Sequence, residues 1–383
     1  METPPFASSG VPPQLTPPPP VITPPLPAKP RRSWGWMIVS LILIVILGFS
    51  LLGNLVQAVS HAIGGGLNRG FKNSTAREVG PKLDEWILEN NGAYNKIAVI
   101  TVDGIITSHS PDQAGYNMVA VIQAQLDRAK DDKHVKAVIL KVDSPGGEVM
   151  ASDEINKAIE KFQDESRKPV ICSMGSLAAS GGYYISAPCR WIVANDLTIT
   201  GSIGVIMHGI NYRGLMDKVG VAPMTFKSGR FKDMLSPDRS TNDIPPEEHA
   251  MVQALIDETF QKFKGVVRTG RAAAHEKNKA EGKPLATDWQ DYADGRVLSG
   301  TQALSLGFVD QVGDFDDAVE RAQRIAKIAD ANLIEYRERY DISDFLSMFG
   351  QNGSAHDLKL DLGLDIPKLR SGCMYFLYQA PDN

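Results

Sequence analysis

Residues 135–148 read Val-Lys-Ala-Val-Ile-Leu-Lys-Val-Asp-Ser-Pro-Gly-Gly-Glu, and they predict a strand, a tight loop and the start of a helix. Apolar residues dominate the run from Val135 to Val142, as is typical of a strand. The Pro-Gly-Gly sequence that follows is common in turns, and residues 148–162 then have helical spacing. A strand that leads through a short loop into a helix indicates a layered α/β domain.

The same alternation continues on both sides of this stretch. Further apolar runs predict strands at residues 97–102, 169–174 and 191–194, and helical spacing recurs at 117–130, 246–267 and 314–328. We therefore expect an α/β domain with parallel strand pairing over residues 95–330. Residues 61–94 are interpreted as a linker and amphipathic stem, and residues 331–383 as a C-terminal tail to which no role is assigned.

The first 60 residues have a different composition. Residues 1–32 are rich in proline and predict a disordered tail with polyproline II character. Residues 33–60 contain no charged side chain and are long enough to cross a bilayer as one helix. A signal peptide would have a shorter apolar segment nearer the N-terminus, so we favour a membrane anchor.

The orientation of this anchor follows from charge. Lys29, Arg31 and Arg32 lie just before the apolar run. Positive residues favour the cytoplasmic side, which predicts a cytoplasmic N-terminus and places the domain after residue 60 outside the cytoplasm at a bacterial-type inner membrane.

Composition excludes some functions and leaves others open. The chain has a formal net charge of -5 and no long basic block, so nothing supports a nucleic-acid partner. Its three cysteines are too few for a disulfide framework and lack the spacing of a metal site. For Cys172 and Cys189, two buried free thiols are favoured over a disulfide. We expect no metal and no cofactor.

Two glycine-containing segments are candidates for catalysis. Ser180 lies among small residues, after a predicted strand and before a helical segment, whose N-terminal amides can stabilise an oxyanion. Close packing of a helix is the alternative explanation for the same small residues. The loop at residues 143–148 could complete an oxyanion hole or be an ordinary turn.

A nucleophilic serine needs a base, and none of the seven histidines lies in an obvious motif. A lysine can act as the base when burial and its neighbours favour the neutral amine. Lys227 and Lys232 are both candidates, although either could simply be a surface charge.

Four segments in this order resemble the signal peptide peptidase A family of Ser-Lys proteases: residues 143–147, 178–184, 200–205 and 228–233. The resemblance implies a crotonase-like, Clp protease-like spiral of strand-strand-helix repeats and hydrolysis of signal peptides. It assigns Ser180 as nucleophile, Lys232 as general base and Ser202 as the residue that orients the lysine. Gly147 and Gly181 become the oxyanion-hole donors, and a single motif copy implies a short form that assembles as a homo-oligomeric ring.

Three other functions compete with signal-peptide hydrolysis. The same protease chemistry could act on a different membrane-protein substrate. A crotonase-type enzyme could use the glycine amides to polarise an acyl-CoA thioester without the Ser180–Lys232 pair. An inactive membrane scaffold could recruit partners through its proline-rich tail.

Overall fold

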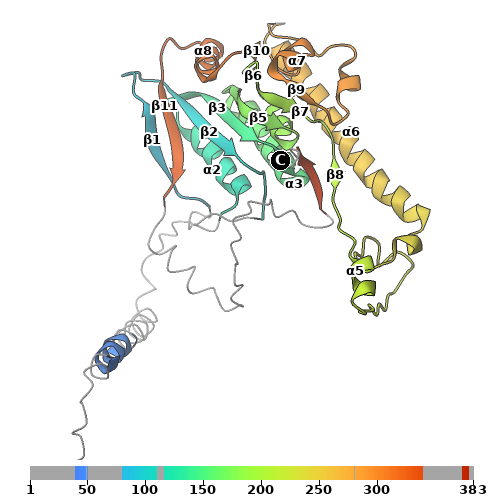
Figure 1. The fold of residues 1–383 in the computed structure, drawn as a ribbon. Coiled ribbons are helices and arrows are strands. Elements are labelled where there is room, and N and C mark those ends of the chain that lie inside the picture. The colour runs from blue at the N-terminus through green and yellow to red at the C-terminus, as the bar shows by residue number, and fades with distance from the viewer. Residues whose placement is uncertain are drawn as a thin grey trace, which may run out of the picture. The chain divides into compact units, whose positions relative to one another are not determined.

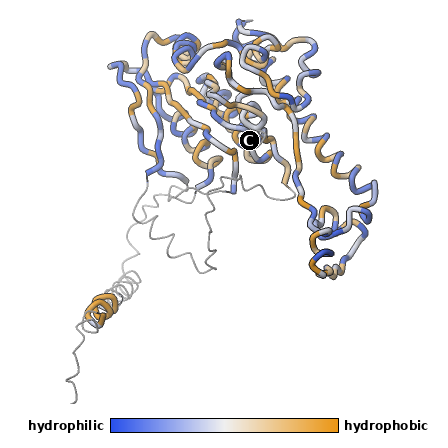
Figure 2. Tube along the Cα trace, viewed as in Figure 1, coloured by the Kyte–Doolittle hydropathy of each residue, from blue (hydrophilic) through white to orange (hydrophobic). Residues whose placement is uncertain are grey.

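The structure is a computed structural model that describes residues 39–48, 50, 80–109, 116–279, 281–339 and 373–378. The chain divides into two units, residues 1–77 and residues 78–383. In the first unit, residues 39–48 form an exposed apolar helix, which is orange in Figure 2. Within the described ranges no helix is both long and apolar enough to span a membrane. The rest of the predicted span 33–60, the tail 1–32 and residues 61–79 of the predicted stem lie outside those ranges.

The second unit is built on two sheets (Figure 1). The larger sheet has nine strands in the order β1-β11-β2-β3-β5-β6-β10, with β7 on β5 and β9 on β7. The smaller sheet has the order β4-β12-β8. The strands are β1 Leu83–Glu89, β2 Lys96–Asp103, β3 Val135–Ser144, β4 Gly146–Glu148, β5 Val170–Ala179, β6 Trp191–Ala194, β7 Ile199–Gly201, β8 Ile206–Met207, β9 Val297–Ser299, β10 Gln311–Val312, β11 Asn332–Glu338 and β12 Met374–Leu377.

The described helices of this unit connect these strands and cover them. They are α2 Met118–Asp131, α3 Val149–Ser166, α4 Gly181–Ser186, α5 Arg213–Lys218, α6 Pro246–Lys277, α7 Gly300–Ser305 and α8 Phe315–Ala326, with short 3-10 turns η1 Thr241–Asp243 and η2 Trp289–Tyr292. Pairing is parallel between β11, β2, β3, β5 and β6, and antiparallel between β1 and β11. The mixed α/β class is therefore established.

The central strands are nearly continuous apolar runs because helices bury both faces of the sheet. Along β3, Val138 and Leu140 belong to the core that contains residues of α2, α3 and α4. Ala137 and Ile139 alternate with them and pack in the core that contains residues of α8. This alternation is the period of two expected when successive side chains point to opposite faces.

The domain extends beyond residues 95–330 on both sides. β1 comes from the predicted stem, and β11, which the sequence analysis placed in the C-terminal tail, lies inside the larger sheet between β1 and β2. β12 comes from the same predicted tail and is the middle strand of the smaller sheet. The predicted helix at 246–267 continues to Lys277 in α6.

One smaller expectation concerns the cysteines. Cys172 and Cys189 are both buried and unpaired, as favoured from the sequence. The Cys172 Sγ lies 3.2 Å from the Ser186 hydroxyl. Burial raises the pKa of the Cys189 thiol well above its usual range, so the thiol is protonated at neutral pH.

Candidate active site

Ser180 lies at the sharp turn between β5 and α4. Its backbone has φ 53 and ψ -114, a conformation that non-glycine residues rarely adopt. Two hydrogen bonds hold this turn: the Ser180 amide donates to Gly201 O at 2.8 Å, and Tyr184 N donates to Ser180 O at 2.8 Å. A strained strand-to-helix turn of this kind can expose a nucleophilic serine directly before the N-terminus of a helix.

The start of β4 lies directly against this turn. A Cβ on Gly181 would lie 2.7 Å from Ser152 Oγ and 3.0 Å from both Gly146 Cα and Gly147 N, so the backbone of β4 packs closely against this turn. Gly147 has no space for a side chain, because a Cβ there would lie 1.9 Å from Ile106 O. Gly146 has φ +99, which favours glycine. The structure therefore brings the amides of Gly147 and Gly181 together beside Ser180.

Side-chain hydrogen bonds hold the segment around Gly146 and Gly147 in place. The Ser144 hydroxyl donates to Gly104 O at 2.6 Å and accepts from Gly146 N at 3.0 Å. Glu148, only 8% exposed, accepts from Thr107 Oγ1 and Ser108 N, each at 3.0 Å. Burial alone would raise the pKa of Glu148, but hydrogen bonds from Ser108, His109 and Thr107 outweigh burial and lower it. A charged carboxylate thus anchors one end of β4.

Ser180 opens into a cavity of about 570 Å³. Ser202 also lines this cavity and has a left-handed backbone with φ 49, held by a 2.7 Å hydrogen bond from its amide to Arg296 O. Hydrogen bonds from Arg296 lower the pKa of Asp294, another lining residue, to about 2. The remaining lining residues are Gly204, Val205, Ile206, His208, Gln253, Ile256, Asp257, Phe260, Gly295, Leu377 and Tyr378.

Lys232 is not among the residues that line this cavity. It is exposed and belongs to residues 208–245, here called the arm, which extend away from the sheets past α5 in Figure 1. Lys227, also on the arm, forms an ion pair with Asp233 at 2.7 Å. The structure thus groups Ser180, Ser202, Gly147 and Gly181, and it leaves Lys232 apart from them within one chain.

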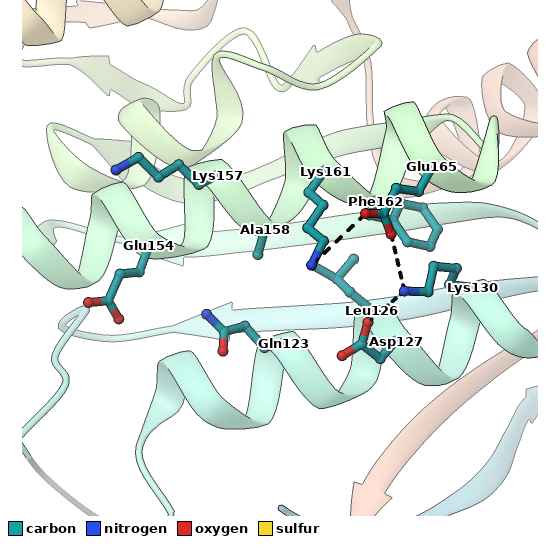
Figure 3. A pocket seen from close by; sticks show the side chains of 10 residues that line it. All are labelled: Gln123, Leu126, Asp127, Lys130, Glu154, Lys157, Ala158, Lys161, Phe162 and Glu165. Carbon is teal, nitrogen blue, oxygen red and sulfur yellow. Dashed lines mark hydrogen bonds and ion pairs between the residues drawn. The ribbon is translucent and has the colours of Figure 1, made fainter.

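A second hollow lies between α2 and α3 and has a different chemistry (Figure 3). Lys130 bonds to Asp127 at 3.1 Å and to Glu165 at 3.3 Å, and Lys161 lies 4.0 Å from Glu165. This hollow is the groove between two packed helices, and paired surface charges lie over its apolar residues Leu126 and Phe162. In the described part of the chain, no group of three or more His, Cys, Asp or Glu side chains could hold a metal ion.

Two features of the site were not predicted. One is the cluster around Glu148, which only the approach of residues 106–109 to β4 creates. The other is β12, whose following residue Tyr378 lines the cavity with Leu377. β12 has only four residues and lies far from the rest of the site in sequence. Its apolar residues therefore carry no local signal that would assign this strand to the site.

Sequence comparisons show the family to which the chain belongs. The family model "Peptidase family S49" matches residues 162–329. A signal peptide peptidase SppA of Enterococcus faecium is 35% identical over 324 residues, which cover 83% of this chain and 87% of that protein. The chain belongs to peptidase family S49. Protease 4 of Haemophilus influenzae is 34% identical over 260 residues, or 67% of this S49 peptidase and 38% of that longer relative.

Among solved structures, a ClpP1 mutant from Listeria monocytogenes matches with a TM-score of 0.34 and 13% identity, over 58% of the S49 peptidase and 94% of that chain. The family match includes Ser180, Ser202 and Lys232 but begins after Gly147. Family membership establishes a serine-type peptidase.

Proposed function

We propose that this S49 peptidase is a membrane-anchored endopeptidase that uses a Ser180–Lys232 dyad to hydrolyse signal peptides or other short membrane-derived peptides. The observation that carries the proposal is the strained turn at Ser180, which opens into the cavity beside the amides of Gly147 and Gly181. Strained backbone at a nucleophile is typical of sites where pre-organisation serves catalysis. The strand-helix units β2–α2, β3–β4–α3 and β5–α4 support the crotonase-like arrangement.

The reaction is acyl transfer. Neutral Lys232 takes the hydroxyl proton of Ser180, and the serine oxygen adds to the peptide carbonyl. The amides of Gly147 and Gly181 donate hydrogen bonds to the oxyanion, and the leaving amine takes the proton. Water then hydrolyses the acyl-enzyme, and Ser202 positions the lysine amine.

The base must reach Ser180 from the arm, and we infer that a second copy of the chain supplies it. The arm exposes large apolar side chains, including Leu215 at 63%, Met224 at 82% and Phe226 at 90%. Clusters of this kind favour burial against a protein partner. Association of identical subunits, as in the ring expected for the short form, would cover the arm and bring Lys232 to a neighbour's cavity.

Membrane attachment is part of the same proposal. The absence of charged residues from 33–60 and the basic residues just before them support a single-pass anchor with a cytoplasmic N-terminus. The catalytic unit would then act outside the cytoplasm on peptides released at the membrane.

Peptidase assays on the full chain test the dyad. Ser180→Ala and Lys232→Ala should each lower kcat/KM for a synthetic signal peptide by at least about a thousandfold, because each removes one partner of a single chemical step. Lys227→Ala is the matched control and should retain activity. Labelling by a fluorophosphonate should require Ser180. Activity in Lys232→Ala would reject this base, and an inactive parent would reject the function.

Mixing the two inactive variants tests delivery of the base by a neighbour. If Lys232 acts on the Ser180 of another subunit, co-expressed Ser180→Ala and Lys232→Ala chains form some sites with both groups intact. Activity should recover to a quarter or so of the parent's value, as expected when both residues of a site are drawn from separate subunits at random. No recovery in a mixed oligomer would mean that each chain supplies its own lysine.

A further inference from the structure

The turn Asp-Gly-Arg at residues 294–296, just before β9, lies against the segment that carries Ser202. The Ser202 amide donates to Arg296 O at 2.7 Å. A Cβ on Gly204 would lie 3.2 Å from Gly295 Cα, so the two segments also approach closely through glycine backbones. The backbone of the turn thus helps to hold Ser202 at the cavity wall.

The two charged side chains of this turn form a forked ion pair. Arg296 Nε donates to Asp294 Oδ1 at 2.7 Å, and Arg296 Nη2 donates to Asp294 Oδ2 at 2.6 Å, so both carboxylate oxygens are engaged. The Arg296 amide adds a 3.1 Å hydrogen bond to Asp294 Oδ1. These bonds lower the pKa of Asp294 to about 2, so its carboxylate is charged at neutral pH and that charge is paired.

Asp294 lines the cavity in which the proposed reaction needs a neutral lysine. A carboxylate near the amine of Lys232 would favour the ammonium form, which cannot act as a base. The other ionisable side chains that line the cavity are Asp257 on α6, His208 and Tyr378. Asp257 accepts from Gln253 at 2.8 Å, whereas Asp294 belongs to the turn that is bonded to Ser202.

The guanidinium group has further neighbours on η2. Its carbon lies 5.2 Å from the centre of the Tyr292 ring, and the charge of Asp291 also acts on it. Arg296 is not among the residues that line the cavity. The arginine therefore lies behind the carboxylate, where it can affect the reaction only through its partner.

We propose that Arg296 is a positioning residue for the peptidase reaction, which pairs with Asp294 so that no unpaired negative charge faces the lysine amine at Ser202. The lysine can then lose its proton and act as the base. The inference rests on the proposed function, because it takes Lys232 as that base.

The pH dependence of kcat/KM for a synthetic signal peptide tests this on the full chain. Activity that needs a neutral amine rises with pH through the pKa of the amine in the free enzyme. In Arg296→Gln the unpaired carboxylate favours the ammonium, so this rising limb should move up by about one pH unit. On the acid side, kcat/KM should fall about tenfold, and above the limb the variant should approach the parent.

Two further variants separate charge from structure. Asp294→Asn leaves the guanidinium unpaired, which disfavours a second cation, so the limb should move to lower pH. Arg296→Gln combined with Asp294→Asn leaves neither charge and should bring the limb back to the position of the parent.

Arg337→Gln is the matched control. It breaks an ion pair of the same spacing on β11, in which Arg337 Nε lies 2.7 Å from Glu335 Oε2. The two arginine side chains are 52% and 50% exposed. The control should leave the rising limb where it is in the parent.

An unmoved limb in either single variant, or an equal loss of kcat/KM at every pH that Asp294→Asn does not reverse, would overturn the inference and leave the proposed dyad intact. The proposed function fails separately, if Lys232→Ala is active or the parent hydrolyses no peptide.

Discussion

The turn at Ser180 and the arm that carries Lys232 differ in how far one chain determines them. Around Ser180, the backbone of β4 packs closely against the turn, and the helix that follows is entirely buried. On the arm, no residue of α5 is buried, and Phe226 is 90% exposed. Packing within one chain fixes the first region, so the positions of Ser180 and the two glycines do not depend on another subunit. The second exposes large apolar side chains, and under the proposed function its contacts come from another subunit.

Adding a methyl group to one glycine in each region should give the largest difference in kcat between the two regions. In Gly147→Ala the new Cβ would lie 1.9 Å from Ile106 O, so the loop must shift and its amide leaves the oxyanion position. Loss of one such donor lowers kcat by about a hundredfold or more. Gly214→Ala on α5, where a Cβ meets nothing within 4 Å, is the control and should retain kcat within about threefold. Similar kcat values for both variants would mean that the Gly147 amide is not an oxyanion donor.

A charge on the arm should affect assembly and leave the fold of one chain intact. Phe226→Asp should weaken subunit association and lower activity about tenfold, because the charge would be buried at the proposed interface, which would bring Lys232 to its neighbour. Sedimentation velocity and peptidase assays at matched concentrations would measure both effects. Leu197→Asp, at a residue 82% exposed outside the arm, is the control. An unchanged oligomer with full activity would show that the arm is not the interface.

The smallest effect is expected at Glu148, which anchors β4 from within the chain. Its pKa is lowered in the fold, so its stabilising contribution is present above the ordinary glutamate pKa, about 4.3, and is lost as pH falls through the folded value. Glu148→Gln should therefore lower the free energy of unfolding by about 1–2 kcal/mol at pH 7. The difference from the parent should shrink below about pH 4.

Urea unfolding over a pH series would measure this difference, with Glu89→Gln, at an exposed carboxylate that ends β1, as the control. A difference that does not change with pH would mean that packing of the Glu148 side chain matters more than its charge.

The α/β class, the strands β2, β3 and β5, and the turn at Ser180 could be predicted from the sequence. These features depend on runs of neighbouring residues: apolar stretches long enough to be buried on both faces, and small residues at a strand-to-helix junction. The resemblance added roles for Ser202, Gly147 and Gly181, and the structure places all three near Ser180. Lys232 could be named in the same way, but the structure of one chain does not bring it to the cavity.

Local sequence therefore determined that this chain is an α/β protein with a serine at a glycine-lined turn, because each of those features is encoded within about 15 contiguous residues. Only the tertiary structure decided that β11 lies between β1 and β2, and that Phe376 pairs with Gly147. Pairing between short strands more than 200 residues apart depends on which edges the rest of the fold leaves open, and a strand of four residues has no periodicity that names its partner.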